Sequence, residues 1–410
     1  MAPPRPFTVE QWMDKYELTA KYNLAETCCA SISIDELLAL SEKKDAKISD
    51  ILCSSTVQNY GEIRGNTQLR ENLSRLYSAK VAGAALSVDQ ILITPGAIAA
   101  NHLVLYSLVH PGDHVICHYP TYQQLYTIPE SLGAEVSLWK CRAEEGWLPK
   151  LEELEGLVRE NTKLIIINNP QNPTGAILPK SHLDAIVRLA RARNITILSD
   201  EVYRPLFHGV GPMDPDFPPS MLSVGGDDAN VIVTGSLSKA YSLAGLRVGW
   251  IASRSAELIE RCASTRDYTT ISVSLLDQAV ATFALGPDTI HALLGRNVAL
   301  ARANLEMLER WVMKHDEFCE WVKPVAGTTA FVRFFRGEGE SRKAVDARVF
   351  CERLQERTGV MLLPGDVGFG EEFRGYVRFG YVNRTEIIRE GLEELRKFMR
   401  EEFNDIPLCE

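Results

Sequence analysis

Residues 234–250 read TGSLSKAYSLAGLRVGW. The apolar run Val231–Val233 leads into this stretch, and a second apolar run, Val248–Ala252, leaves it. Between them a turn rich in glycine and serine presents Lys239. Short apolar runs bounded by such turns are typical of buried strands, so we expect this lysine at the end of a strand. Burial lowers the pKa of an amine and frees its lone pair, which makes Lys239 a candidate covalent nucleophile.

Ser236, Ser238 and Arg247 flank this lysine in the sequence. Hydroxyl donors in fixed positions and a permanent cation are the groups that bind phosphate. A lysine taken alone is usually a solvated surface residue. The combination of these four residues instead favours a site for a phosphorylated ligand.

The middle of the chain alternates strands with helices. Apolar runs occur at residues 91–93, 115–117, 136–139, 164–167, 195–198, 231–233 and 248–252. Helical patterns occupy residues 98–109, 122–132, 150–160 and 180–193. Uninterrupted apolar strands that alternate with helices predict an α/β fold, in which a mostly parallel sheet is covered on both faces.

The C-terminal part lacks this regular alternation. It shows a long helical pattern over residues 286–314, a strand at 331–334, a helix over 344–357, a strand at 375–381 and a helix over 385–402. A chain of 410 residues is also too long for one small core. We therefore predict an N-terminal arm that contributes to a small domain (residues 1–45), a large domain (46–285) and a smaller α+β domain (286–410).

Composition argues against several classes of function. The net charge of −10 disfavours a nucleic-acid partner. The nine cysteines include no C-x-x-C pair, so neither a metal site nor a redox motif is indicated, and the roles of Cys28 and Cys29 stay open. No phosphate-loop or dinucleotide-binding glycine motif occurs. The absence of an apolar leader or a membrane-length apolar run predicts a cytoplasmic protein without a membrane partner.

Further candidate residues follow the predicted strands, at the sheet edge where open α/β folds bind ligands. Gly96, Ala97 and Ile98 lie where the first strand turns into a helix, whose free N–H groups can bind phosphate. Asp200 ends another strand, and a carboxylate inside an apolar sheet should face a cation or a protonated ring nitrogen. Asn172 lies in the turn-rich segment Asn168-Asn-Pro-Gln-Asn-Pro-Thr-Gly175.

Over roughly residues 50–385 these motifs, in this order, resemble the class I/II aminotransferases of fold type I, which hold pyridoxal phosphate (PLP) covalently on a lysine. The resemblance implies a seven-stranded type of sheet in the large domain. It also implies that Lys239 binds PLP and is catalytic, with Asp200 at the pyridine nitrogen and Asn172 and Tyr203 at the phenolic oxygen. Tyr122 would lie against the ring, while His118 and Glu201 would be structural. The phosphate would be bound by Gly96, Ala97, Ile98, Ser236, Ser238 and Arg247.

The same resemblance implies a homodimer and a carboxylate-binding arginine. Arg378, in Tyr376-Val-Arg-Phe-Gly-Tyr-Val382, matches the arginine that binds the α-carboxylate of the substrate, with Arg374 as its competitor. Tyr60, in Asn59-Tyr-Gly-Glu-Ile-Arg-Gly65, matches the tyrosine that reaches the phosphate of the neighbouring subunit, although a locally packed loop tyrosine is the alternative.

The implied activity is transfer of an amino group between an amino acid and a 2-oxo acid. Two departures leave alternatives open: Ile98 stands where the family usually has Ser or Thr, and Ala25-Glu-Thr-Cys-Cys29 stands where it often has Gly-x-Pro. A cyclase, eliminase or replacement enzyme that resembles capreomycidine synthase, or a non-enzymatic regulatory protein, would carry similar residues. Glu26 would select a cationic substrate and Arg266 an acidic one.

Overall fold

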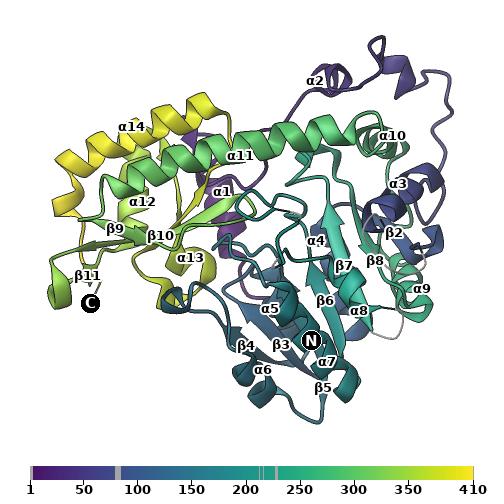
Figure 1. The fold of residues 1–410 in the computed structure, drawn as a ribbon, viewed down its shortest axis with the longest axis horizontal. Coiled ribbons are helices and arrows are strands. Elements are labelled where there is room, and N and C mark those ends of the chain that lie inside the picture. The colour runs from purple at the N-terminus through teal and green to yellow at the C-terminus, as the bar shows by residue number, and fades with distance from the viewer. Residues whose placement is uncertain (1–2, 79–84, 212, 216, 227–229, 410) are drawn as a thin grey trace.

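The computed structural model describes residues 3–78, 85–211, 213–215, 217–226 and 230–409. Its centre is a seven-stranded sheet in the order β2-β8-β7-β6-β5-β3-β4 (Figure 1). The strands are β2 (Ile91–Thr94), β3 (His114–Tyr119), β4 (Glu135–Lys140), β5 (Thr162–Asn168), β6 (Thr196–Asp200), β7 (Val231–Ser236) and β8 (Gly249–Ala252). Only β8 runs antiparallel to its neighbours β2 and β7. The predicted mostly parallel, seven-stranded α/β sheet is confirmed.

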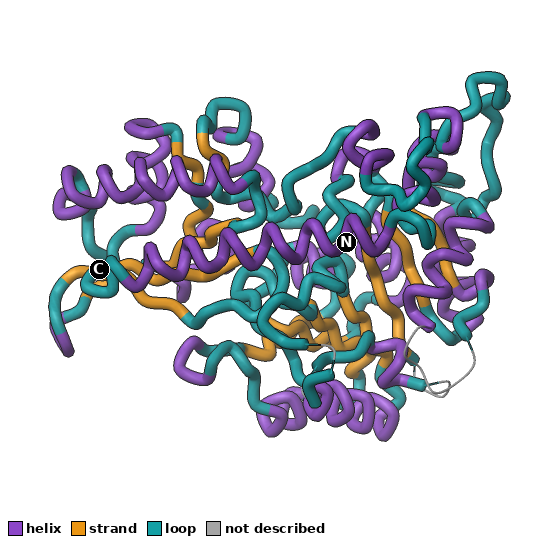
Figure 2. The backbone as a smooth tube through the Cα atoms, turned by 45° about the horizontal axis from the view of Figure 1, so that its top comes forward, coloured by secondary structure: helices purple, strands orange, loops and turns teal. Residues whose placement is uncertain are grey.

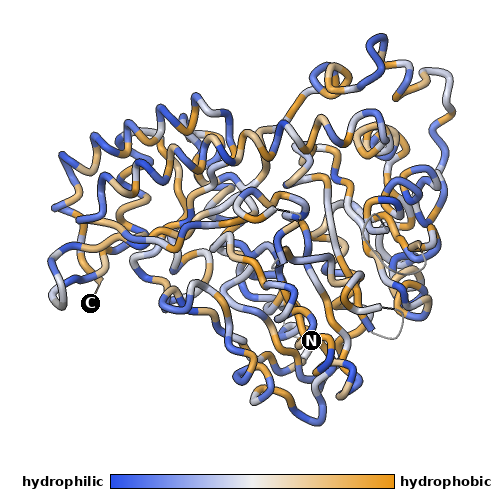
Figure 3. Tube along the Cα trace, in the orientation of Figure 1, coloured by the Kyte–Doolittle hydropathy of each residue, from blue (hydrophilic) through white to orange (hydrophobic). Residues whose placement is uncertain are grey.

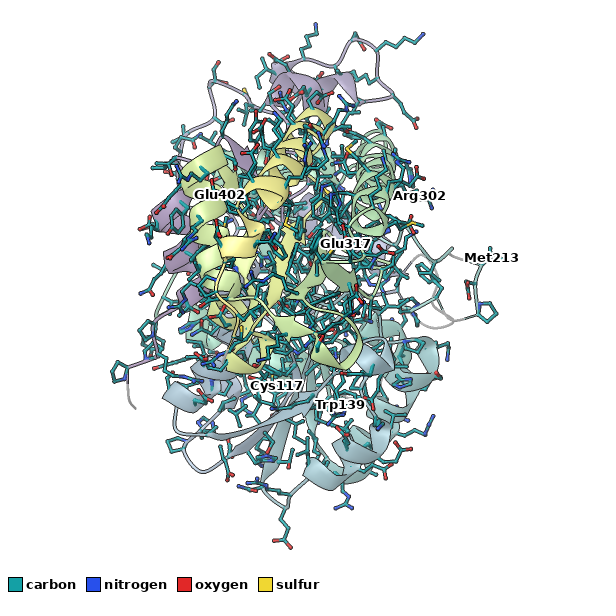
Figure 4. The ribbon with its side chains drawn as sticks, turned by 90° about the vertical axis from the view of Figure 1, so that its left-hand side faces the viewer. Cys117, Trp139, Met213, Arg302, Glu317 and Glu402 are labelled. Carbon is teal, nitrogen blue, oxygen red and sulfur yellow. The ribbon has the colours of Figure 1, made fainter. Side chains whose placement is uncertain are left out.

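Both faces of this sheet are covered because successive side chains point to opposite sides. Ile166, Leu198 and Ile232 belong to one apolar cluster with α4 (Ala97–Leu108), α5 (Gln124–Ser131) and α9 (Ala256–Arg266). Ile165 and Ile197 belong to the other, with α7 (Lys180–Arg193) and α8 (Met221–Gly225). Figure 3 shows the strands as mainly hydrophobic segments, and in Figure 4 Trp139 and Cys117 lie within this lobe whereas Met213 projects from the surface.

A second, smaller lobe is built on a five-stranded sheet in the order β11-β10-β14-β13, with β9 paired to β10. Its strands are β9 (Cys319–Trp321), β10 (Thr329–Arg336), β11 (Lys343–Ala344), β13 (Leu363–Pro364) and β14 (Tyr376–Gly380). Its helices are α12 (Ala347–Thr358), α13 (Gly365–Phe369) and α14 (Thr385–Glu401). The long α11 (Ile290–Met313) runs across from the large lobe to the small one (Figures 1 and 2).

The predicted helix over 344–357 begins later than expected. Ala344 pairs with β10 as part of β11, and Asp346 then caps α12 by accepting a hydrogen bond from the Val349 N–H at 3.0 Å. An aspartate at the N-cap marks the start of a helix, and this signal outweighs the helical pattern of the residues before it.

The N-terminal segment packs with the small lobe. Here α1 (Thr8–Tyr16) is followed by β1 (Tyr22–Asn23), which pairs in parallel with β12 (Val360–Met361). The next residues contact both lobes. The N–H of Ala30 donates to the Val382 carbonyl at 2.8 Å in the small lobe, and the N–H of Cys29 donates to the Lys239 carbonyl at 3.1 Å in the large lobe.

The remaining elements surround these two lobes. They are α2 (Ile34–Ala39), α3 (Thr67–Ser78), α6 (Leu151–Leu157), α10 (Leu275–Ala284) and the short 3₁₀ helices η1 (Ile48–Asp50), η2 (Val88–Gln90), η3 (Ala143–Glu145), η4 (Ala244–Leu246), η5 (Gly339–Ser341), η6 (Glu371–Phe373) and η7 (Phe403–Asp405). None of the described helices is both long and apolar enough to cross a membrane.

Gly380 provides a test of how the N-terminal segment is held. Its N–H donates to the Leu24 carbonyl at 2.7 Å, and a Cβ at this position would lie 1.7 Å from the carbonyl oxygen of Glu26. Gly380→Ala should therefore displace residues 24–26 and destabilise the protein by about 1–3 kcal/mol, the usual cost of overpacking. Thermal unfolding measures the effect.

Gly156→Ala is the matched control. Gly156 lies in α6, where an added Cβ meets no atom within 4 Å. This control should be neutral or slightly stabilising, because alanine favours a helix over glycine. Equal melting temperatures for Gly380→Ala and the wild type would contradict the close packing of segment 24–26 on β14.

Candidate active site

A cavity of about 360 Å³ lies where β5, β6 and β7 end, between the sheet and the N-terminal segment. It brings together twelve of the residues predicted from the sequence: Glu26, Ala97, Ile98, Tyr122, Asn172, Asp200, Tyr203, Ser236, Ser238, Lys239, Arg247 and Arg378. These residues are spread over positions 26–378 of the chain, and the fold brings them together at one site.

Lys239 lies three residues beyond β7, and its Nζ reaches into the cavity. Nζ donates a hydrogen bond to Thr27 Oγ1 at 2.5 Å and contacts Cys28 Sγ at 3.3 Å. Neither Thr27 nor Cys28 was predicted as a site residue. The only signal in the sequence was the departure from the family pattern at residues 25–29.

The sequence predicts a lowered pKa for Lys239, but in the protein without a bound cofactor this pKa is raised. Burial opposes the ammonium charge, but Cys28, Tyr203 and Glu26 favour it and raise the pKa of Lys239 above its ordinary value. Burial raises the pKa of Cys28 to about 11 and also raises that of Tyr203, so both are neutral at neutral pH. Glu26 is therefore the neighbour whose negative charge faces the lysine.

At one end of the cavity, donors gather that suit a phosphate. Ser236 Oγ donates to Ser238 Oγ at 2.8 Å, and Arg247 Nη1 donates to Ser238 Oγ at 3.3 Å. Gly96 is the N-cap of α4 with φ 83°, and a Cβ there would lie 2.7 Å from Arg247 Nη2. Only glycine accommodates both this φ and this approach, so the arginine lies beside the free N–H groups that begin at Ala97.

Asp200 ends β6 and is 3% exposed. Its carboxylate accepts hydrogen bonds from Asn101 Nδ2 at 2.9 Å and from the Val202 N–H at 3.0 Å, and Thr234 Oγ1 donates to Asn101 Oδ1 at 2.6 Å. Burial nevertheless raises the pKa of Asp200 to about 6. A cationic ring nitrogen would restore its charge. The sequence analysis missed Asn101, although a lone amide within the apolar pattern of α4 was a usable signal.

Arg378 lies on β14 and is 3% exposed. Its Nη1 donates to Asn172 Oδ1 at 3.3 Å and its Nη2 to the Ala25 carbonyl at 2.8 Å, while its buried Nε has no partner. Burial lowers the pKa of Arg378. The competitor Arg374 is exposed and forms an ion pair with Glu371 at 2.7 Å, so Arg378 is the arginine that faces the cavity.

Helix α1 closes the outer side of the cavity, which the sequence did not reveal. Val9, Glu10, Met13 and Glu17 line it. Tyr122 Oη donates to Glu10 Oε1 at 2.7 Å. No pattern in the sequence connects these N-terminal residues with the strand ends, because tertiary contacts of α1 and β1 with the small lobe bring them there.

Two predicted residues lie elsewhere. Tyr60 is 77% exposed in the loop before α3. Arg266, the last residue of α9, is 1% exposed and lines a different cavity of about 840 Å³, where its Nη1 donates to the Ile93 carbonyl at 3.3 Å. Within one subunit, neither side chain reaches the cavity that holds Lys239.

The two residues that the sequence analysis set aside are buried and engaged with protein groups. His118 Nε2 lies 3.0 Å from Cys141 Sγ. Glu201 pairs with Arg204 at 3.1 Å and accepts from the Met221 N–H at 2.7 Å. Within the described ranges, no group of three or more acidic, histidine or cysteine side chains is arranged to hold a metal ion.

A half-buried lysine, a buried carboxylate and a phosphate-type cluster on this sheet define a PLP-dependent transferase of fold type I. Residues 35–395 match the family model for aminotransferase class I and II, and the chain belongs to this family. The solved structure of a PLP-dependent aminotransferase from Streptococcus suis is 40% identical, covers 97% of this chain and 98% of its own, and superposes with a TM-score of 0.85.

Two curated relatives are also similar to this chain. An aspartate aminotransferase of Thermotoga maritima is 30% identical over 83% of each chain. A capreomycidine synthase of Streptomyces vinaceus is 29% identical over 91% of this chain and 88% of its own.

The residues present fit PLP. Arg247, the two serines and the start of α4 suit its phosphate, and Asp200 suits its ring nitrogen. A Cβ at Gly96 would collide with Arg247, and burial raises the pKa of Asp200, so a closer cation would favour its charged form. PLP is therefore the cofactor that the family and this site share.

Asp200→Ala should retain PLP but react slowly, because the ring nitrogen then loses the carboxylate that keeps it protonated. We expect turnover to fall by roughly two to four orders of magnitude, equivalent to about 3–5 kcal/mol, as for loss of one partner from a buried charge pair. Bound PLP is measured by absorbance and turnover by product formation. Near-normal turnover in this variant would remove Asp200 from its predicted role.

Proposed function

We propose that Lys239, Asp200 and Arg378 carry out transfer of an amino group between an amino acid and a 2-oxo acid. The observation that carries this proposal is the convergence of a lysine amine, a buried carboxylate and a buried arginine on one cavity. PLP supplies the electron sink that stabilises negative charge at the substrate's α-carbon. The protein supplies orientation, charge and proton transfer.

Lys239 is the proposed general base. Once released from the cofactor, Nζ would be free to remove the proton from the substrate's α-carbon and to deliver it to the cofactor carbon that keeps the amino group, as amino transfer requires. Thr27 Oγ1, at 2.5 Å, orients the amine. Asp200 holds a proton at the cofactor's ring nitrogen, since a buried carboxylate with a raised pKa gains most from a cationic partner.

Arg378 is the proposed partner of the substrate's α-carboxylate. Its planar guanidinium can bind a carboxylate through two parallel hydrogen bonds. Asn172 Oδ1 and the Ala25 carbonyl hold the two Nη atoms, and Nε stays available inside the cavity. This arrangement fixes the α-carbon relative to Lys239, which is the main requirement for rapid proton transfer.

We also propose a homodimer in the cytoplasm. Tyr60, Ile98, Tyr106, Tyr268 and Ile271 are 39–93% exposed, which is unusual for large apolar side chains of one subunit. Ile98, Tyr106 and Tyr268 border the 840 Å³ cavity, whose lining is mainly apolar. A second subunit would cover these residues, and all nine cysteines are free, as in reducing compartments. The large domain at 46–285 and the small domain at 1–45 plus 286–410 are proposed as the units of each subunit.

A PLP-dependent cyclase is the second candidate. The relative from Streptomyces vinaceus carries the name capreomycidine synthase, and Thr27 and Cys28 next to Lys239 depart from the usual aminotransferase segment. The two activities differ in their products. An aminotransferase releases a 2-oxo acid and consumes a second one, whereas a cyclase retains the amino group in a ring.

Reduction with borohydride tests the lysine assignment. The reagent makes the bond between an amine and the cofactor's aldehyde carbon permanent, so peptide mapping should find the pyridoxyl group on Lys239. Lys239→Ala is the control and should carry no label. A label on another lysine would contradict the assignment, and a wild-type protein without any label would contradict the use of PLP.

Hybrid dimers test the proposed role of Tyr60. If Tyr60 completes the neighbouring site, each single variant, Tyr60→Ala or Lys239→Ala, is impaired. A mixed dimer then has one site without either defect. Mixing the two variants should restore about a quarter of the wild-type activity, because half of randomly exchanged dimers are mixed and each has one of two sites intact. No recovery despite demonstrated subunit exchange would place Tyr60 outside the partner's site.

A further inference from the structure

The outer part of the cavity carries an excess of carboxylates. Glu10 and Glu17 line it from the N-terminal segment, and Glu26 lines it from the segment that covers Lys239. Glu10 and Glu17 lie seven positions apart on either side of Met13, at the spacing of two helical turns, so they occupy the same face of α1 and its end. Both residues are exposed to solvent and also line the cavity.

These carboxylates form no close ion pair among the described residues, and Lys239 is the cation whose charge acts on Glu26 and Glu17. No ion pair engages Glu10, Glu17 or Glu26 there. Glu10 Oε1 accepts from Tyr122 Oη, and Glu26 Oε1 accepts from the N–H groups of Thr27 and Cys28 at 2.6 and 2.7 Å. Hydrogen bonds to neutral donors hold these side chains in position without cancelling their charge, and Glu26 Oε2 takes no part in them.

The cations that line the cavity are committed elsewhere. Lys239 holds the cofactor, Arg247 lies among the phosphate donors, and Arg378 faces the position of the α-carboxylate. With the cofactor and an ordinary amino acid in place, the acidic face would remain without a counter-charge. Like charges gathered in a partly enclosed site are unfavourable unless a cation joins them.

A second observation indicates a ligand that carries both a negatively and a positively charged group. The buried Nε of Arg378 has no hydrogen-bond partner, although it lies in the wall of the same cavity. Buried N–H donors normally form a hydrogen bond, so we expect the ligand to supply the acceptor for this N–H. The cavity therefore presents an unpaired donor that favours an anion, together with carboxylates that favour a cation.

We propose that the substrate is an α-amino acid whose side chain ends in an ammonium or guanidinium group, bound by Glu10 and Glu17 together with Glu26. This inference rests on the proposed amino-transfer function and specifies its substrate class. Arg378 fixes the α-carboxylate, and the carboxylates select the distal cation. A neutral side chain of equal length fits the same space but leaves the acidic face unpaired.

The electrostatics of Glu17 agree with this assignment. Partial burial, followed by the nearby charges of Glu26 and Glu10, raises the pKa of Glu17. A cation between these groups reverses the repulsion and favours the charged form of all three. Arg266, the residue that would select an acidic side chain, is buried beside Ile93 in a different cavity and faces no substrate within its own subunit.

The test compares charged substrates with neutral ones of the same shape in the PLP-loaded enzyme. Cofactor absorbance follows both binding and the first half-reaction. Arginine is compared with citrulline and lysine with norleucine, and glutamate and aspartate serve as acidic substrates. We expect kcat/KM for arginine or lysine to exceed that of its neutral counterpart by about 100-fold or more, the level that an opposite charge provides in a partly desolvated site.

Variants then assign the preference to the acidic face. Glu17→Gln is the most informative single change, because the Glu17 carboxylate, unlike that of Glu10, accepts no side-chain hydrogen bond that the change would disturb. The double variant Glu10→Gln/Glu17→Gln removes both carboxylates of the helical face. The double variant should reduce the arginine-to-citrulline ratio at least tenfold, through KM more than kcat. Asp14→Asn removes an equal charge from the same helix outside the cavity and should leave the ratio unchanged.

The outcomes separate this inference from the proposed function. Faster reaction with glutamate, alanine or norleucine than with arginine or lysine would overturn the substrate class while leaving amino transfer intact. An unchanged ratio in the double variant would overturn the role of the acidic face. If no amino acid yields a 2-oxo acid, the proposed function fails. The binding comparison still decides the inference, since arginine must then perturb the cofactor absorbance at lower concentration than citrulline does.

Discussion

The register of three parallel strands determines where the chemistry of this protein can occur. Asn168 at the end of β5 pairs with Asp200 at the end of β6, and Asp200 pairs in turn with Thr234 on β7. Because parallel strands present their carboxyl ends at one edge, the polar residues that follow each strand meet there. A shift of one residue in β6 would turn the Asp200 side chain to the opposite face, away from the cavity.

The strands that end at this edge are apolar, so burying a polar group there costs free energy. The polar residues of the site offset part of this cost with hydrogen bonds. Asp200 is retained in the sheet only with hydrogen bonds from Asn101 and Val202, and its pKa stays high even so. Arg378 is likewise buried and Lys239 is half-buried, and each donates hydrogen bonds to neutral oxygen atoms. The protein thus holds isolated charges in fixed positions, which is the arrangement that a charged cofactor and substrate stabilise.

The sequence allowed the large sheet, its order of strands and helices and most of the cavity wall to be predicted. Buried parallel strands appear in the sequence as unbroken apolar runs. The residues that follow these strands lie at one edge of the sheet, independently of the conformation of the loops. The contribution of α1 could not be predicted, because Glu10 and Glu17 reach the site through tertiary contacts of α1 and β1 with the small lobe, such as the hydrogen bond from Trp12 Nε1 to the Leu362 carbonyl. The antiparallel direction of β8 also left no trace, since its apolar run looks the same in either direction.

The short segment around residues 24–30 has a mechanical consequence. It is hydrogen-bonded to the small lobe through Leu24 and Ala30 and to the large lobe through Cys29, whose partner is the backbone of Lys239. A rotation of the small lobe therefore pulls directly on the main chain that carries the lysine. The segment thus couples the position of the reactive amine to the orientation of the small lobe.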